Sequence, residues 1–146
     1  MRFEQMGFDD QVKRLRQIQV RLNNTMYSGE LMLIPVDIVN LNADAWAGYK
    51  KPCDLVPYGK IMIDHNYIVE VVATAKTIRE QKYLLALMIL HEMAHQYCYE
   101  HWLDDNNHGT EWQKVANEHG LDVHYDNGKL IHEDLRSVVY VALASL

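Results

Sequence analysis

Apolar side chains recur at spacings of three and four in two long segments of the chain, and this spacing predicts two helices that each bury one face. Asp9 or Asp10 can cap the first helix, and Asn23-Asn24 is expected to end it. The buried face of this first helix is expected to consist of Val12, Leu15, Ile18, Gln19 and Leu22.

The second segment predicts a longer helix. Thr77-Ile78-Arg79-Glu80 has the sequence of a capping box, which marks the N-terminus of a helix. Neither Gly nor Pro interrupts the chain from Glu80 to about Tyr99. The inward stripe of this helix is expected to contain Leu84, Leu87, Met88, His91, Ala94, His95 and Cys98.

Shorter apolar runs between these two helices predict strands. Residues 36–39 are expected to form the first strand, and residues 60–64 form another of alternating character. Residues 45–49 fit a short strand or a bend at Gly48, and residues 67–75 fit a short helix and a strand equally well.

Turn and capping signals organise the chain after the longer helix. A loop rich in Asp, Asn and His precedes a second capping-box sequence, Thr110-Glu111-Trp112-Gln113, and Gly120 is suited to end the helix that starts there. Asp126-Asn127-Gly128 predicts a hairpin turn. A last helix is expected from about Glu133.

Length and composition describe a small protein with one core. The 146 residues suffice for a single domain, 1–146, and the longest apolar run, 84–90, is too short to cross a bilayer. The N-terminus has no apolar signal segment, and Cys53 and Cys98 make no disulfide framework, so a cytoplasmic location is expected. The net charge of −6 argues against a protein that binds nucleic acid through its overall charge.

Within the longer predicted helix the chain reads His91-Glu92-Met93-Ala94-His95, an H-E-x-x-H sequence. Residues four apart share a helix face, with Cβ atoms about 5–6 Å apart, so the rings of His91 and His95 can hold one zinc ion. Glu92 lies about 100° further round the helix, in the position of a zinc peptidase's general base. One inward His is usually a satisfied core residue, but two with Glu92 between them favour a shared metal, because unpartnered buried polar groups are costly.

Catalytic zinc usually has three protein ligands, so a third is expected downstream. His108 precedes Gly109 and the second capping box, which would fix it on a rigid corner facing the longer helix. Glu111 and Glu118, on the helix that follows, are the candidates for a site with two His and one Glu. Cys98, one turn beyond the second His, is more typical of a small core residue.

The H-E-M-A-H sequence, followed after a polar loop by His108-Gly109 and Trp112 as H-G-x-x-W, resembles the SprT-like metalloprotease domain, the catalytic core of Spartan-type proteases. Trp112 stands where that family usually has Phe. Residues 45–49 and 60–64 resemble the family's strand pair, so the resemblance covers roughly residues 8–120. It implies a zincin-like α+β fold, with a small sheet of about three strands packed on helices and an active-site helix that carries H-E-x-x-H.

The resemblance also implies the site and the reaction. His91, His95 and His108 resemble the ligands of one catalytic Zn²⁺, and Glu92 resembles the catalytic base. The expected activity is that of a zinc metalloendopeptidase acting on a protein or peptide substrate, including DNA-associated or DNA-crosslinked proteins. Two alternatives stay open: a non-enzymatic protein-binding module stabilised by zinc, and a His-His-Glu peptidase unrelated to DNA.

Contact with DNA is expected to be weak and salt-sensitive. Many SprT-like proteins carry a Cys-rich zinc ribbon after the protease core, and two cysteines are too few for such a site. The basic residues are expected to be solvated surface, and they form two clusters: Lys13, Arg14, Arg16 and Arg21 in the first helix, and Lys50, Lys51 and Lys60 around the strand pair.

Further side chains have expected roles around the metal. Residues 60–64 are expected to form an edge strand that holds an extended substrate by strand addition. Trp102 and Trp112 are expected to pack around the metal and keep the site dry. Candidate donors to a developing oxyanion are His65, His101, Tyr97 and Tyr99. Surface positions are expected for His119, His124 and His132.

Overall fold

The computed structural model describes residues 1–42 and 45–146, which form an α+β fold with a small three-stranded sheet, as predicted. The described helices are each too short or too polar to cross a bilayer. In chain order the elements are η1 (Phe3–Gln5), α1 (Phe8–Met26), β1 (Val36–Val39), β2 (Ala47–Lys50), β3 (Lys60–Asp64), α2 (His65–Glu70), η2 (Val72–Thr74), α3 (Ile78–Glu100), α4 (Thr110–Glu118), β4 (Val123–Asp126), β5 (Lys129–His132) and α5 (Arg136–Ala142).

The three-stranded sheet has the order β1-β3-β2. β1 runs parallel to β3, with Val36 opposite Ile61, and β2 runs antiparallel to β3, with Ala47 opposite Ile63. Ile61 and Ile63 are fully buried beneath the helices. The prediction that residues 60–64 form an edge strand is wrong, because β3 is paired on both sides; β1 and β2 are the outer strands of the sheet as described.

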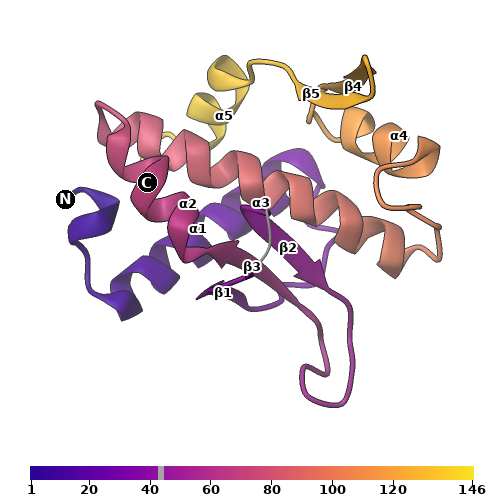
Figure 1. The fold of residues 1–146 in the computed structure, drawn as a ribbon, viewed down its shortest axis with the longest axis horizontal. Helices are drawn as coiled ribbons and strands as arrows, with labels where there is room; N and C mark the ends of the chain where they lie inside the picture. Colours follow the sequence, from indigo (N-terminus) through magenta and orange to yellow (C-terminus); the bar gives the residue numbers. More distant parts are fainter. Residues whose placement is uncertain (43–44) are drawn as a thin grey trace.

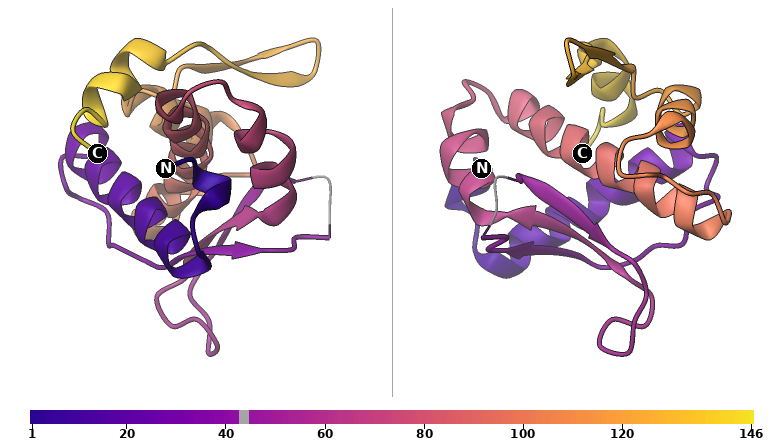
Figure 2. Two further views of the ribbon diagram at one scale, coloured as in Figure 1. Left: turned by 90° about the vertical axis from the view of Figure 1, so that its left-hand side faces the viewer. Right: turned by 45° about the vertical axis from the view of Figure 1, so that its right-hand side comes forward.

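The long helix α3 lies in the middle of the molecule. Figures 1 and 2 show α1 and the three-stranded sheet on one side of it and the C-terminal elements α4, β4, β5 and α5 on the other. Buried side chains therefore occupy most of the helix circumference, as the positions of Gln81, Tyr83, Leu85, Ala86 and Cys98 show at about 100° per residue.

The predicted inward stripe of α3 is only partly right. Its members Leu84, Leu87 and Met88 are half-buried, while deeply buried positions such as Leu85, Ile89 and Met93 lie on the opposite face of the helix. A helix packed on several sides has no single inward face, so a search for one apolar stripe cannot rank its positions by burial.

Helix α1 buries Leu15, Ile18, Gln19 and Leu22 as predicted, while Val12 is only half-buried, and the helix continues past Asn23 to Met26. The buried amides of Gln19 and Asn23 hold the segment that leads into β1. Gln19 Nε2 donates to the carbonyl of Ile34 at 2.9 Å, and the Asn23 side chain bonds both backbone groups of Leu31. Asn23 therefore anchors the next segment and does not end the helix.

The start of α4 differs from the prediction, while the turns around it agree. Gly109 is the N-cap and Thr110 is already helical, so the second capping box is wrong. Gly120 follows α4 with a φ of 91°, as expected of a glycine that ends a helix. Asn127 and Gly128 have φ values of 51° and 78°, which form the predicted tight turn between β4 and β5.

The two predicted capping boxes give a matched pair for a stability test. Thr77 Oγ1 accepts from the Glu80 N–H at 3.0 Å, although the Glu80 carboxylate binds Arg136 and Tyr140 and does not reach back to Thr77. Thr77→Ala should lower the free energy of unfolding by about 1 kcal/mol in urea titrations. Thr110→Ala, the control, should change it by less than about 0.5 kcal/mol. Equal losses for both variants would contradict the observed caps.

Candidate metal centre

Three histidine rings meet between α3 and α4. His91 and His95 lie one turn apart on α3, and His108 lies in the loop just before α4. His108 Nε2 is 2.8 Å from His91 Nε2 and 3.2 Å from His95 Nε2. One nitrogen from each ring lies within 4.8 Å of the other two, a group that could hold one metal ion. The prediction that His108 joins the two α3 histidines is confirmed, while metal ligation stays a prediction.

Close packing of the loop places His108. A Cβ atom added to Gly109 would come within 2.9 Å of Asn106 Cβ and 3.3 Å of the Asp105 carbonyl oxygen, so a larger residue would push the loop apart. The φ of Gly109 is an ordinary −73°, so the glycine is needed for space rather than for its backbone freedom. Gln113 Nε2 donates to the His108 carbonyl at 3.0 Å and holds the loop to α4.

Asp105 is a partner of the cluster that the sequence did not indicate. Its Oδ2 atom lies 2.8 Å from Nδ1 of His95. An ionised carboxylate only accepts hydrogen bonds, so Nδ1 of His95 carries the proton and Nε2 presents its lone pair to the cluster. This His–carboxylate pair is a common outer-shell arrangement at metal sites. The loop's richness in Asp and Asn was the available signal, but it did not single out Asp105.

His132 corrects a second prediction. It was expected at the surface, but it is half-buried at the end of β5, with Nε2 at 3.0 Å from Nδ1 of His91. His124 is exposed as expected. His119 is half-buried and stacks on Tyr27 with ring centroids 4.2 Å apart.

Trp112 forms the apolar wall of the cluster. It is fully buried, and its ring centroid lies 4.8 Å from that of His91, 5.3 Å from that of His95 and 4.6 Å from that of His108. The predicted packing of Trp112 around the three rings is therefore confirmed. Trp102 is 96% exposed and has no such role, so the same prediction for Trp102 is wrong.

The Glu92 side chain lines the same cavity as the three histidines. The cavity has a volume of about 380 Å³, and its wall opposite α3 includes Ala47, Gly48 and Tyr49 of β2. Glu92 Oε2 is 3.9 Å from His91 Nε2, and burial raises the pKa of the Glu92 carboxyl to about 8. Such a carboxyl holds a proton at neutral pH, and a cation placed nearby would favour its ionised form.

Burial also determines the protonation of the rings. Burial, and secondarily the neighbouring rings, lower the pKa of His91 to about 2 and that of His108 to about 4. Burial lowers the pKa of His95 as well, against the opposing effect of Asp105. The three rings are therefore neutral at pH 7, which is the form that binds metals.

The other predicted candidates lie apart from the three converging nitrogens. Glu111 and Glu118 are exposed on α4, and Cys98 is buried in the core, as expected of a small apolar residue. Of the proposed oxyanion donors, His65 and His101 are exposed, and Tyr97 is stacked against His101. Tyr99 lines a neighbouring hollow with Tyr49, His95 and Asp105. Tyr49 lines both cavities, although nothing in the sequence pattern singled it out.

Comparisons of the chain with protein-family models, with curated proteins and with solved structures gave no significant match. The evidence for function therefore lies in the geometry of the three histidines, Glu92 and their cavity, together with the sequence motif.

The identity of the third ligand can be tested by substitution. His108→Ala should weaken zinc binding by more than about 100-fold, because a direct ligand contributes more than an outer-shell residue. Glu111→Ala and Glu118→Ala are the matched controls and should keep full affinity, since both side chains are exposed outside the cluster. Affinity is measured by competition with a chelator, and folding by circular dichroism. Loss of zinc from a Glu variant while His108→Ala binds normally would indicate a His-His-Glu site.

Proposed function

We propose that this protein is a zinc-dependent metallopeptidase, with His91, His95 and His108 as the metal ligands and Glu92 as the general base. The observation that carries the proposal is that the buried Glu92 carboxyl opens into the cavity where the three histidine rings converge. The resemblance of its motifs to SprT-like proteases supports the same assignment, and with it a zincin-like fold for residues 1–146.

The donor set fits a catalytic zinc ion. The carboxylate of Asp105 requires the proton of His95 to sit on Nδ1, so His95 Nε2 faces the other two Nε2 atoms with a lone pair. Neutral imidazoles repel one another at such distances unless a proton or a cation lies between them. Zinc readily takes three imidazole ligands and keeps a fourth position for water or substrate.

The residues around the site can then take separate roles in peptide hydrolysis. When bound, zinc lowers the pKa of a coordinated water to about 7 and polarises a carbonyl group. Glu92 accepts the proton of the attacking water and returns it to the departing amine. Burial raises the pKa of Glu92 in the metal-free site, and a bound cation would favour the ionised carboxylate that acts as the base. Trp112 excludes solvent from the far side of the rings.

The outer strand β2, rather than β3, is the proposed guide for the substrate. β2 pairs with β3 along one side only in the described sheet, and Ala47, Gly48 and Tyr49 line the cavity beside Glu92. An extended peptide that added to this edge would bring its backbone along the cavity.

Specific observations weigh against the two alternatives. A purely structural zinc site has no use for a buried carboxyl beside the ligands, and such sites are usually closed by four protein ligands. A His-His-Glu site would need Glu111 or Glu118, and both are exposed outside the group of three histidines.

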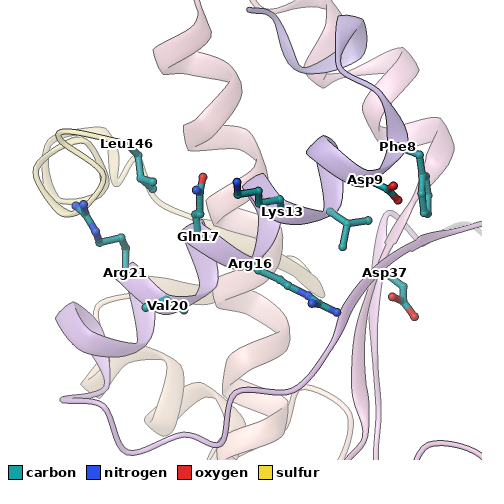
Figure 3. A pocket seen from close by; sticks show the side chains of 10 residues that line it. Phe8, Asp9, Lys13, Arg16, Gln17, Val20, Arg21, Asp37 and Leu146 are labelled. Atoms are coloured by element: carbon teal, nitrogen blue, oxygen red, sulfur yellow. The ribbon is translucent and has the colours of Figure 1, made fainter.

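DNA-associated proteins remain the proposed substrates on the strength of the resemblance alone. Lys13, Arg16 and Arg21 line a groove of about 750 Å³ along α1, but Asp9 and Asp37 line it too (Figure 3). Arg21 is also engaged by the C-terminal segment, since it donates to the Ala144 carbonyl. The groove therefore has mixed charge and is poorly suited to a phosphate backbone.

The role of Glu92 predicts a separation of binding from catalysis. Glu92→Gln should keep one zinc per chain and native stability, while proteolysis of a labelled unfolded protein should fall by about 10²–10⁴-fold. The matched control is Glu111→Gln on α4, which should retain full activity. Unchanged turnover in Glu92→Gln would remove the general base from the proposal, and loss of zinc would show that the carboxylate is a ligand.

Weak DNA binding is the expected behaviour of this mixed-charge groove. Fluorescence anisotropy with single- and double-stranded oligonucleotides at physiological salt should give dissociation constants weaker than about 1 μM, the range of non-specific binders. Raising the salt should abolish the residual signal, because only phosphate contacts contribute. Tight binding that Arg16→Ala reduces would contradict this expectation and would support a substrate on DNA.

A further inference from the structure

The two histidines of the H-E-x-x-H motif each use both ring nitrogens. Nε2 of each faces His108, and Nδ1 of each points to a second partner on the opposite side of its ring. For His95 that partner is the carboxylate of Asp105 at 2.8 Å, and for His91 it is His132 Nε2 at 3.0 Å. His132 thus occupies the position at His91 that Asp105 occupies at His95.

We propose that His132 is a positioning residue of the metal centre, which accepts a hydrogen bond from Nδ1–H of His91. This bond fixes the His91 tautomer, with the lone pair on Nε2, and holds its ring towards His95 and His108. The inference rests on the metal site of the proposed function but not on its proteolytic activity.

Ring chemistry determines the direction of this bond. A neutral imidazole has one N–H and one lone pair, so a His91 that ligates through Nε2 must carry its proton on Nδ1. His132 Nε2 then has to accept, and the proton of His132 lies on its own Nδ1. His132 meets His91 on the side of the ring away from His108, so it is an outer-shell partner and not a fourth member of the converging group.

The C-terminal hairpin holds the His132 side chain in place beside α3. His132 lies opposite Val123 in the β4–β5 ladder, and Val123 is buried. Asn117 of α4 exchanges two hydrogen bonds with the backbone of Val123, at 2.8 and 3.1 Å. Three residues after His132, the Leu135 N–H donates to the Tyr83 hydroxyl of α3 at 3.1 Å. His132 is therefore held between an anchor on α4 and an anchor on α3.

This arrangement joins the two histidines outside α3 into one structural unit. The N-terminal end of α4 follows His108, and its last turn anchors the strand opposite His132. A shift of α4 relative to α3 would move both contacts to His91 together. The hairpin is thus a part of the metal centre rather than an appendage to it.

Three substitutions of His132 in the full-length protein test the role. His132→Leu removes the acceptor and should weaken zinc binding by about 10–100-fold, the usual effect of losing an outer-shell partner. His132→Gln places a carbonyl oxygen near the position of Nε2 and should restore most of the affinity. His132→Asn places its oxygen near the position of Nδ1, too short to reach His91, and should behave like His132→Leu. The control is His124→Leu, exposed on the same hairpin, which should bind zinc normally.

The readouts are zinc affinity by chelator competition, thermal unfolding of the metal-free variants, and the His91 Nδ1–H signal in ¹⁵N-resolved NMR of the zinc-loaded protein. Rescue by Gln, with a slowly exchanging Nδ1 proton present only in the wild type and His132→Gln, supports the inference. Wild-type affinity in His132→Leu would overturn it, as would equal losses in the Gln and Leu variants. This affinity pattern in a protein without peptidase activity would support His132 and count against the metallopeptidase.

Discussion

The burial of α3 is the constraint on which the rest of the structure depends. A helix enclosed by a sheet, by α1 and by the C-terminal elements has little solvent to satisfy its polar side chains, so each must find a partner in the protein. Gln81 accepts from the Phe3 N–H and donates to the Val72 carbonyl, which joins the N-terminal segment to η2. Gln96 donates to the Met32 carbonyl and holds the segment before β1. These amides hold the segments around α3 in place without the help of a metal ion.

The same constraint shapes the candidate metal centre. His91 and His95 present Nε2 to His108 and Nδ1 to partners in two different segments, so neither ring is free to turn. Burial lowers the pKa of each of the three rings and so keeps them neutral. The lone pairs of neutral imidazoles interact more favourably with a cation than with one another. Glu92 is the exception among the buried polar side chains of α3, because its carboxyl faces the cavity and lies 3.9 Å from His91 Nε2, beyond hydrogen-bond distance.

The sequence by itself determined the features that depend on neighbouring residues. Thr77 caps α3, Asn127 and Gly128 turn the hairpin, and the spacing of His91, Glu92 and His95 sets them on adjacent positions of one helix turn. Each follows from local backbone geometry and short-range hydrogen bonds, which a few consecutive residues are enough to specify. The position of His108 in the cluster could also be predicted from the sequence. The motif required a third ligand, and the start of the following helix limited where the loop that carries it could end.

Only the tertiary structure decided which distant residues meet. His132 lies 41 positions after His91, and its contact depends on the docking of a hairpin against α3 and α4. Asp105 was one of several acidic residues in a polar loop, and only the fold places it beside His95. From the sequence alone Trp102 and Trp112 had the same expected role, whereas packing buries Trp112 and leaves Trp102 exposed. The central place of β3 likewise follows from pairing with β1, an arrangement that no local pattern encodes. Such contacts are selected by the packing of whole elements, whose free energy is summed over many side chains rather than carried by a short motif.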